Sequence, residues 1–209
     1  MSALMAFFYD RTMSALEKAC LHDWRTELLA EVKGEVLEVG AGTGANLAYY
    51  PSNDVRLLLS EPDDAMRKQL ERKVAFIQRD DICLTSLKAE KLTLDDNRFD
   101  YVVASLVCCS VANIEASLAE IFRVLKPGGH YIFIEHVAAK KDSKARRWQE
   151  WLTPLWRKFA GNCHLNRETE KAMARAGFQF EKIQRDAMPD SVPIIVRSSI
   201  HGVAMKPFN

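Results

Sequence analysis

Three glycines at alternate positions form the first stretch whose residue types and spacing can do chemistry. Gly40, Gly42 and Gly44 follow the short apolar run 36–39, which contains one acid, Glu38. Glycines spaced in this way after a strand let the backbone approach a nucleotide-like ligand closely. A tight turn without a ligand needs fewer glycines, so the pattern predicts a ligand site.

The glycine stretch fits two kinds of ligand. Read from Gly40 with Ala45 in the last place, it satisfies the dinucleotide fingerprint, in which a pyrophosphate lies at a helix N-terminus. Read together with Glu38, it suits S-adenosylmethionine, which has no phosphate and carries an α-amine that an acid can meet. Glu61, after the next apolar run, suits the ribose hydroxyls. Both ligands contain ribose, so Glu61 does not discriminate between them.

Glu135 and His136, the two candidate catalytic residues, end a later apolar run, where parallel strands usually present ligand-binding residues. His136 is the candidate general base because imidazole titrates near neutral pH. The alternative is a strand-end histidine hydrogen-bonded to backbone. His164 and His201 are weaker candidates for the same role.

The five cysteines match no paired zinc pattern, and their odd number argues against a closed disulfide framework. We expect reduced thiols in a cytoplasmic protein and no metal site. The adjacent Cys108 and Cys109 are interpreted as pocket wall rather than as a redox pair.

Residues 138–160 carry apolar side chains at steps of three and four, together with seven basic residues and two acids. Pro154 is expected to kink this segment or divide it into two helices. Three interpretations stay open: a lid whose aromatic residues line an acceptor pocket, a contact with a membrane surface, or a core-packing insertion. The position after the fifth predicted strand favours the lid, with Trp148, Trp151 and Trp156 in the acceptor pocket.

The elements that must position these residues alternate between strand and helix. The patterns predict helices over 13–30, from Pro62 to about Lys73, and over 114–125, and strands over 36–39, 55–60, 74–77, 99–106 and 131–134. The runs 178–183 and 194–205 have no helix between them and should pair as an antiparallel hairpin. The predicted fold is α/β, a doubly wound, mostly parallel seven-stranded sheet with a C-terminal antiparallel hairpin.

Length and composition fit one ordinary globular domain. The chain has 209 residues and a formal net charge of +1, so the whole molecule does not attract nucleic acid. No apolar run reaches the length of a signal peptide core or a membrane span. We expect a small-molecule acceptor rather than nucleic acid as partner, and nothing in the sequence indicates an oligomeric state.

Taken together, these features resemble the class I S-adenosylmethionine-dependent methyltransferases. The matching pieces, in order, are LEVGAGTG at 37–44, SEPD at 60–63, KAEKLTLDDNRFDYVV at 88–103 and RVLKPGG at 123–129. A closer likeness, to the family that includes animal small-thiol S-methyltransferases, rests on LVCCSV at 106–111, IEHV at 134–137 and C-x-L-N-R-E at 163–168. The animal proteins have an N-terminal membrane anchor, for which we see no counterpart here.

The resemblance implies S-adenosyl-L-methionine as cofactor, S-adenosyl-L-homocysteine as product and a Rossmann-like methyltransferase fold. It places the cofactor against Glu38, Gly40, Gly42, Gly44, Glu61, Pro62, Ala89, Glu90, Ser105 and Leu106. Of these, Glu38 would approach the amine, Glu61 the ribose, Pro62 the adenine and Glu90 its exocyclic amine. Val107 would line the pocket near the reactive methyl group. Tyr9 and Asp10 would reach the site if the N-terminal segment folds over it.

The predicted organisation is an N-terminal helical segment 1–33 that covers the cofactor, followed by a methyltransferase domain 34–209 with a helical lid at about 138–170. The predicted function is methyl transfer to a small, fairly apolar acceptor, with a thiol as one candidate. Two alternatives stay open: a cofactor-binding protein that acts through a partner without turnover, and an NAD-dependent oxidoreductase.

Overall fold

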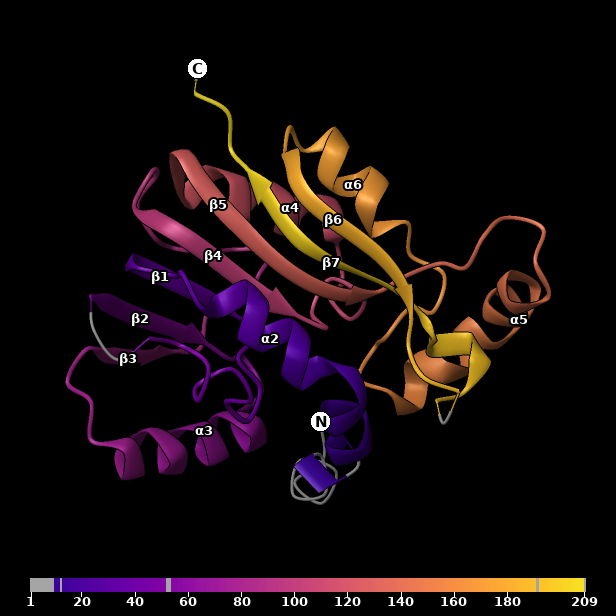
Figure 1. Ribbon diagram of the computed structural model, residues 1–209, viewed down its shortest axis with the longest axis horizontal. Helices are drawn as coiled ribbons and strands as arrows, with labels where there is room; N and C mark the ends of the chain where they lie inside the picture. The colour runs from indigo at the N-terminus through magenta and orange to yellow at the C-terminus, as the bar shows by residue number, and fades with distance from the viewer. Residues whose placement is uncertain (1–9, 12, 52–53, 191, 209) are drawn as a thin grey trace.

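A single mixed sheet organises the protein. In the computed structural model, which describes residues 10–11, 13–51, 54–190 and 192–208, seven strands pair in the order β3-β2-β1-β4-β5-β7-β6 (Figure 1). The first five strands are mutually parallel, β7 is antiparallel to β5, and β6 is antiparallel to β7. This confirms the predicted doubly wound sheet and its closing hairpin. The strands are β1 (Gly34–Val39), β2 (Val55–Ser60), β3 (Ile82–Thr85), β4 (Phe99–Ser105), β5 (Leu125–His136), β6 (Gln179–Ala187) and β7 (Ser198–Met205).

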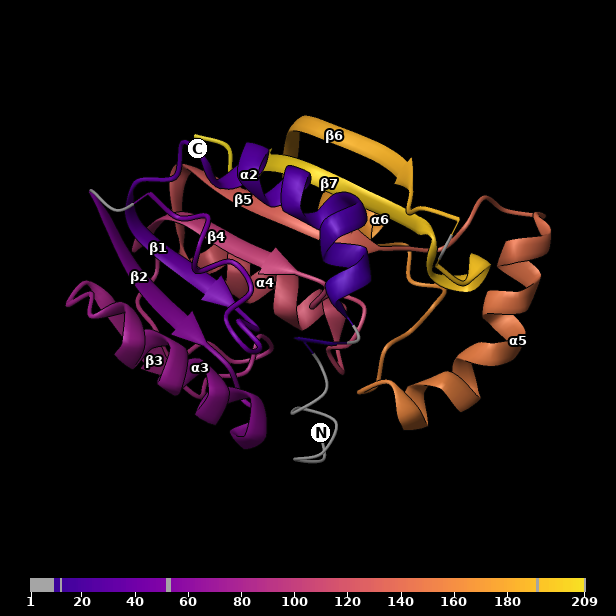
Figure 2. The same cartoon turned by 60° about the horizontal axis from the view of Figure 1, so that its bottom comes forward.

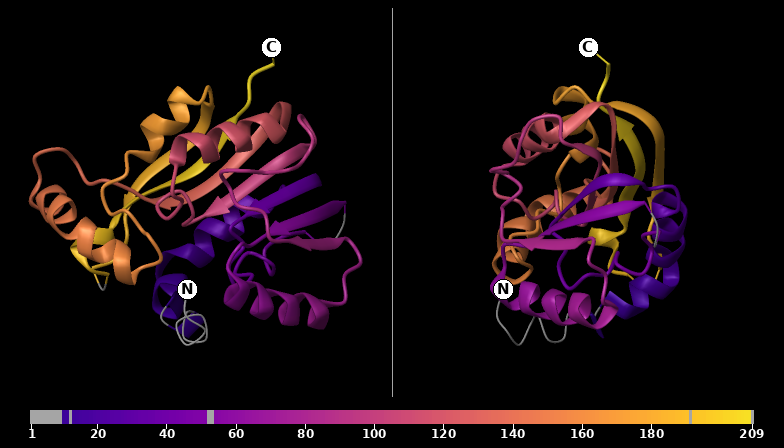
Figure 3. Two further views of the ribbon diagram at one scale, coloured as in Figure 1. Left: turned by 180° about the vertical axis from the view of Figure 1, so that it is seen from behind. Right: turned by 90° about the vertical axis from the view of Figure 1, so that its left-hand side faces the viewer.

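Helices cover both faces of the sheet. Helix α2 lies on one face, and α4 and α6 lie on the other (Figures 2 and 3). The 3-10 turn η2 precedes β7, and α5 stands beside it at the end of the sheet. The bounds are η1 (Glu17–Leu21, a π-helical turn), α2 (His22–Leu29), α3 (Asp64–Ile77), α4 (Ile114–Val124), α5 (Lys144–Phe159), α6 (Thr169–Arg175) and η2 (Ile194–Val196).

The central strands supply side chains to two separate cores because neighbouring residues of a strand point to opposite faces. Leu37 and Val102 pack with α4 and α6, whereas Val36 and Val103 pack with α2 and α3. Burial on both faces explains why these strands read as continuous apolar runs in the sequence.

The prediction of a strand over 74–77 is wrong. Helix α3 continues through this run and ends where Gln78 takes a left-handed conformation with φ 54°. Phe76 is 89% exposed and Ile77 39% exposed, so the run does not enter the sheet. An apolar run of four residues does not distinguish helix from strand. The third strand is β3 instead, which begins five residues after the run ends.

Three helices begin at side-chain caps. Asp63 accepts hydrogen bonds from the backbone at the start of α3, Asn113 does so for α4, and Ser143 for α5. Helix α5 stays one helix with Pro154 inside it, and its axis changes direction along its length (Figure 2). Within the described part of the chain, no helix combines the length and apolar character needed to cross a bilayer.

Gly202 is the position where the sheet tolerates a side chain least. It lies in β7 between Phe133 of β5 and Ile183 of β6, and a Cβ atom there would stand 2.0 Å from the carbonyl oxygen of Lys182. We expect Gly202→Ala to lower the free energy of unfolding by more than about 2 kcal/mol, because backbone on an inner strand must move. Urea titration checks this, with Ser198→Ala in the same strand as control. Equal midpoints for the two variants would contradict the prediction.

Candidate functional site

The carboxyl ends of β1, β4 and β5 lie side by side, since β4 pairs in parallel with both of the others. The loops that leave these strands therefore start from the same edge of the sheet (Figure 2). This edge brings together the glycine stretch, the residues after β4, and Glu135 with His136 at the end of β5.

The glycine loop touches the loop that follows β4. The glycine loop continues through turns, rather than a regular helix, over residues 42–49. A Cβ atom on Gly40 would lie 2.6 Å from Cγ2 of Val107, so only glycine lets the two loops approach this closely. A Cβ atom on Gly42 would meet nothing within 4 Å, although the residue has φ 59°. The backbone at Gly42 thus borders free space where a ligand can approach it.

Glu38 is buried beneath the glycine loop. Its two carboxylate oxygens accept hydrogen bonds from Nδ2 of Asn46 at 2.9 Å and from the hydroxyl of Tyr50 at 2.8 Å. Burial raises the pKa of Glu38 to about 7, and these two hydrogen bonds oppose the rise. The carboxylate therefore braces the loop from below. Its predicted contact with the cofactor amine stays a prediction.

Asn46 is a site residue that the sequence interpretation missed. Its amide nitrogen also donates to Oγ of Ser105 at 3.2 Å, so the side chain links the loops after β1 and β4. Its Oδ1 atom is buried and has no hydrogen-bond partner among the described residues. An unpaired buried amide oxygen, on a side chain whose nitrogen bonds Glu38 and Ser105, suits the ammonium group of S-adenosylmethionine. No sequence motif contains Asn46, although it lies only two residues beyond Gly44.

Glu61 holds the glycine loop from the neighbouring strand. One carboxylate oxygen accepts from the backbone N–H of Gly42 at 2.8 Å and the other from that of Asp63 at 2.8 Å. Burial raises the pKa of Glu61, and the two backbone hydrogen bonds oppose that rise. Glu61, the residue predicted to bind the ribose, thus lies directly beside the free space at Gly42.

The remaining residues predicted to contact the cofactor differ in their surroundings. Pro62 is exposed, Ala89 is buried, and Glu90 accepts a hydrogen bond from the backbone of Ala112 at 2.7 Å. Leu106 has φ 60°, a conformation that costs a bulky side chain about 1–2 kcal/mol. Strain of this kind is often found where a backbone is held for ligand binding.

Glu135 fixes the loop after β4. Its fully buried carboxylate accepts backbone hydrogen bonds from Val107 at 3.0 Å, Cys108 at 2.7 Å and Cys109 at 3.4 Å. Burial raises the pKa of Glu135 to about 7, against the effect of these N–H groups. With both oxygens engaged, Glu135 positions the loop, and its predicted catalytic role stays a prediction.

His136 faces sulfur. Its Nε2 atom lies 2.8 Å from Sγ of Cys163, and Nδ1 is buried without a hydrogen-bond partner among the described residues. The sulfur of Cys109 is close to both. A hydrogen bond from Cys109 and the nearby imidazole lower the pKa of the Cys163 thiol. The sequence interpretation identified His136 but assigned no role to Cys163.

The segment that carries Cys163 is bound to the loop after β4. The backbone N–H of His164 donates to the carbonyl of Cys109 at 2.7 Å, and Nδ2 of Asn162 donates to the carbonyl of Ser110 at 2.8 Å. The guanidinium of Arg167 donates to the carbonyl of Cys108. These contacts place the end of α5 against the candidate acceptor side of the site.

The three tryptophans of α5 do not share one environment. Trp148 is 53% exposed and Trp151 72% exposed, and their rings pack edge to face at 5.7 Å. Trp156 is partly buried, and its indole N–H contributes to the lowered pKa of the Cys163 thiol. The structure therefore brings only Trp156 toward Cys163, and the other two lie on the outer face.

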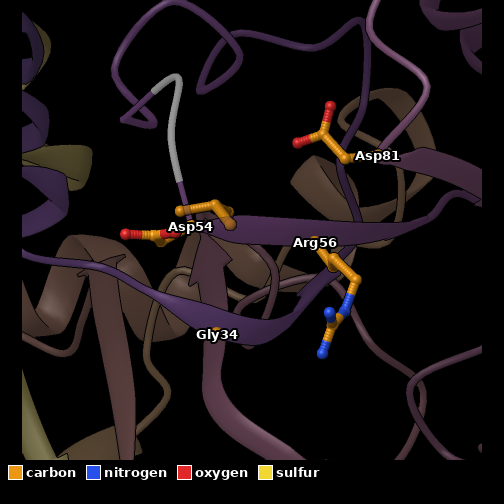
Figure 4. Close-up of a pocket in the computed structure, with 5 residues that line it drawn as sticks. Gly34, Asp54, Arg56 and Asp81 are labelled. Carbon is orange, nitrogen blue, oxygen red and sulfur yellow. The ribbon is translucent and has the colours of Figure 1, made fainter.

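The N-terminal segment reaches the glycine loop through Asp10, which accepts a hydrogen bond from Oγ1 of Thr43 at 2.5 Å and pairs with Lys73 at 2.8 Å. Tyr9 and the rest of residues 1–9 lie outside the described residues. A separate surface pocket lies at the opposite, amino-terminal edge of the sheet (Figure 4). It contains no predicted site residue and is lined by Gly34, Asp54, Val55, Arg56 and Asp81.

Comparison with known proteins identifies relatives along most of the chain. The model of the methyltransferase domain family matches residues 37–133. The human thiol S-methyltransferase TMT1A is 38% identical over 178 residues, which cover 83% of this chain and 71% of that protein. The rat thiol S-methyltransferase TMT1B is 33% identical over 189 residues, covering 85% of this chain and 76% of that protein.

Solved structures share the fold at low sequence identity. A putative methyltransferase from Bacillus halodurans superposes with a TM-score of 0.69 at 19% identity, covering 93% of this chain and 99% of that chain. The [4+2]-cyclase SpnF superposes with a TM-score of 0.71 at 16% identity, covering 90% of this chain and 80% of that one. A cyclase among these neighbours shows that the fold alone does not fix the reaction.

The sequence relatives settle the family. The chain belongs to the class I S-adenosylmethionine-dependent methyltransferases and is an enzyme, which disfavours the two alternatives of a catalytically inactive binding protein and an NAD-dependent oxidoreductase.

We expect Glu61→Ala to weaken binding of S-adenosylhomocysteine by about 10- to 100-fold, because it removes a charged hydrogen-bond acceptor from the ribose side and the brace on Gly42. Calorimetric titration measures the affinity, and Glu71→Ala on the exposed side of α3 is the matched control. Equal affinity in both variants would remove Glu61 from the cofactor site.

Glu38 should make stability depend on pH. The pKa of Glu38 in the folded state is about 7, above the ordinary pKa of a glutamate. Its protonation therefore stabilises the fold fully at pH values below the ordinary pKa, and this stabilisation is lost as the pH rises through about 7. We expect up to about 3 kcal/mol of the free energy of unfolding to disappear between pH 5 and pH 8 through this group. Glu38→Gln should have a flatter profile than the parent in urea titrations across that range. Parallel profiles would contradict the assigned pKa.

Proposed function

We propose that this methyltransferase transfers the methyl group of S-adenosylmethionine to the sulfur of a small, fairly apolar thiol. The observation that carries the proposal is the extent of the likeness to TMT1A, which is a thiol S-methyltransferase. That likeness covers 83% of the chain, whereas the common domain spans only residues 37–133. It therefore extends beyond the domain that binds the cofactor in this family.

The donor half of the proposed site is the edge of β1 and β2. The backbone at Gly42 borders the methionine portion, Asn46 and Glu38 lie on the amine side, and Glu61 lies on the ribose side. Pro62, Ala89 and Glu90 would surround the adenine, with Ser105 and Leu106 closing the pocket. When bound, S-adenosylmethionine supplies a methyl group on a sulfonium that is already a good leaving group.

The acceptor half is the edge of β4 and β5. Val107 lies against Gly40, and Glu135 holds Val107 and its two successors in place, so an acceptor beside Val107 is near the donor half. Binding the two substrates in line and excluding water can supply up to roughly 7–11 kcal/mol of the acceleration.

The acceptor thiol must lose its proton, because the thiolate is the nucleophile and an ordinary thiol has a pKa of about 8.5. We assign the promotion of this proton loss to His136, which lies within hydrogen-bond distance of Cys163 at the end of β5. Of the three tryptophans predicted to line the pocket, Trp156 is the one on the inner face of α5. Trp148 and Trp151 contact the acceptor only if α5 moves over the site.

The test is transfer of labelled methyl from S-adenosylmethionine to a panel of alkyl and aromatic thiols, phenols, amines and quinone precursors. We expect transfer to apolar thiols, with little to their oxygen and nitrogen counterparts. Preferential methylation of any other class in the panel would overturn the thiol assignment.

We expect His136→Ala to lower kcat for an alkyl thiol by about 100-fold or more, with the affinity for S-adenosylhomocysteine unchanged. An aromatic thiol that is already ionised at neutral pH should lose much less, because its proton has already left. Calorimetry and steady-state assays of both substrates separate the two effects. An equal loss for both thiols would show that His136 acts on something other than the acceptor proton.

A further inference from the structure

Two thiols and one imidazole converge behind the loop after β4. Cys109 follows β4, His136 ends β5, and Cys163 follows α5. One ligand atom from each lies within 4.8 Å of the other two. Cys109 and His136 are buried and Cys163 is half-buried, so the cluster lies largely inside the protein.

Other contacts hold the backbone of Cys109 and the backbone of His136 in place independently of each other. Glu135 accepts a hydrogen bond from the backbone of Cys109, and His164 donates to the carbonyl of the same residue. His136 is fixed by the sheet, because it pairs with Ser199 of β7. Preorganisation of this kind is what a metal site requires of its ligands.

The ligand set selects the type of ion. Two sulfurs and one imidazole suit Zn²⁺, whereas Mg²⁺ and Ca²⁺ require oxygen ligands. In tetrahedral zinc geometry, ligand atoms stand roughly 3.6–3.8 Å apart. The three atoms here lie within 4.8 Å of one another, and Nε2 of His136 and Sγ of Cys163, now 2.8 Å apart, would separate by roughly 1 Å on binding zinc. Three protein ligands with one open position characterise zinc sites that bind a substrate rather than purely structural ones.

Charge favours the same conclusion. Zinc binds cysteine as the thiolate, and one divalent ion compensates the charge of two thiolates completely in this largely buried place. Arg167, the nearby guanidinium, donates instead to the carbonyls of Cys108 and Val111. The cysteines themselves are free thiols and are not joined in a disulfide.

We propose that Sγ of Cys109, Sγ of Cys163 and Nε2 of His136 bind one Zn²⁺, and that the fourth position receives the sulfur of the acceptor thiol. The second half of this statement rests on the proposed function. The sequence predicts no metal because the ligands are 27 residues apart at each step, 109 to 136 to 163, and no short motif contains them.

In this zinc site, His136 promotes the loss of the acceptor proton as a ligand of the ion. A thiol that binds the ion releases its proton to solvent and remains as a bound thiolate. A lone pair of that sulfur forms the new bond to the methyl carbon while the carbon–sulfonium bond breaks and its electrons return to the donor sulfur. The products are a thioether and S-adenosylhomocysteine, and the neutral thioether leaves as a weaker ligand. No oxidant or reductant takes part.

The first experiment measures zinc in protein purified without chelators and dialysed against metal-free buffer. We expect roughly one ion per chain in the parent, and less than about a tenth of that in Cys163→Ser and His136→Ala. Cys83→Ser, which changes an exposed cysteine on β3, is the matched control and should keep its zinc. Binding of S-adenosylhomocysteine verifies that each variant is folded.

Cobalt(II) replacement in the parent protein keeps the test independent of the variants. We expect thiolate-to-cobalt charge-transfer bands and the visible bands of a tetrahedral site. A parent chain that binds neither zinc nor cobalt, or that purifies with a Cys109–Cys163 disulfide in place of metal, overturns the proposal.

The open position is tested by adding an apolar thiol to the cobalt protein. A shift of the visible bands with the thiol, and none with the corresponding alcohol, supports the sulfur as fourth ligand. No shift with the thiol overturns that part. Thiol methylation that persists in metal-stripped protein overturns the assignment of the acceptor sulfur to the fourth position and leaves the proposed function standing. Zinc-loaded protein that methylates no thiol overturns the proposed function, and with it the fourth-position assignment, but leaves the three-ligand zinc site standing.

Discussion

The buried carboxylate of Glu135 is the contact on which both halves of the site depend. It accepts hydrogen bonds from three successive backbone N–H groups, those of Val107, Cys108 and Cys109, in a place without solvent. Unpaired, each of these groups would cost about 1–3 kcal/mol. Val107 at one end of this triplet touches the glycine loop, and Cys109 at the other end belongs to the cysteine–histidine cluster. One interaction thus connects the glycine loop with the cysteine–histidine cluster, the proposed donor side and the proposed acceptor side.

The parts of the fold that follow from local pattern could be predicted from the sequence. Four of the five parallel strands, the glycine loop and the closing hairpin appear where the periodicity and the glycines indicate them. The strand prediction for 74–77 failed because so short an apolar run is compatible with either helix or strand. The run is helical because α3 begins at the cap of Asp63 and does not end until Gln78. Burial could not be inferred from residue type either, since Phe76 is almost fully exposed.

The parts of the site that depend on the meeting of distant segments could not be predicted. Asn46 has no distinguishing neighbours in the sequence, and its importance arises from its position between Glu38 and Ser105. Cys163 looks like a solitary cysteine until the bonds from Asn162 and His164 place it beside His136. The outward orientation of Trp148 and Trp151 likewise follows from which face of α5 packs on the protein, because Gln149 and Thr153 occupy the buried face.

The chemistry explains why the two halves differ in their side chains. A sulfonium donor needs no activation, so the donor side requires only shape and hydrogen bonds, and its two acids, Glu38 and Glu61, are engaged by protein donors. A protonated thiol acceptor is a poor nucleophile and must become a thiolate before it reacts. Groups that exchange protons or bind soft ligands are therefore useful only on the acceptor side. His136, Cys109 and Cys163 lie together on the proposed acceptor side, near the carboxyl ends of β4 and β5. The thiols and the imidazole are thus concentrated on one side of the sheet edge. A methyltransferase whose acceptor is a thiol needs such groups on the side where the acceptor must lose its proton.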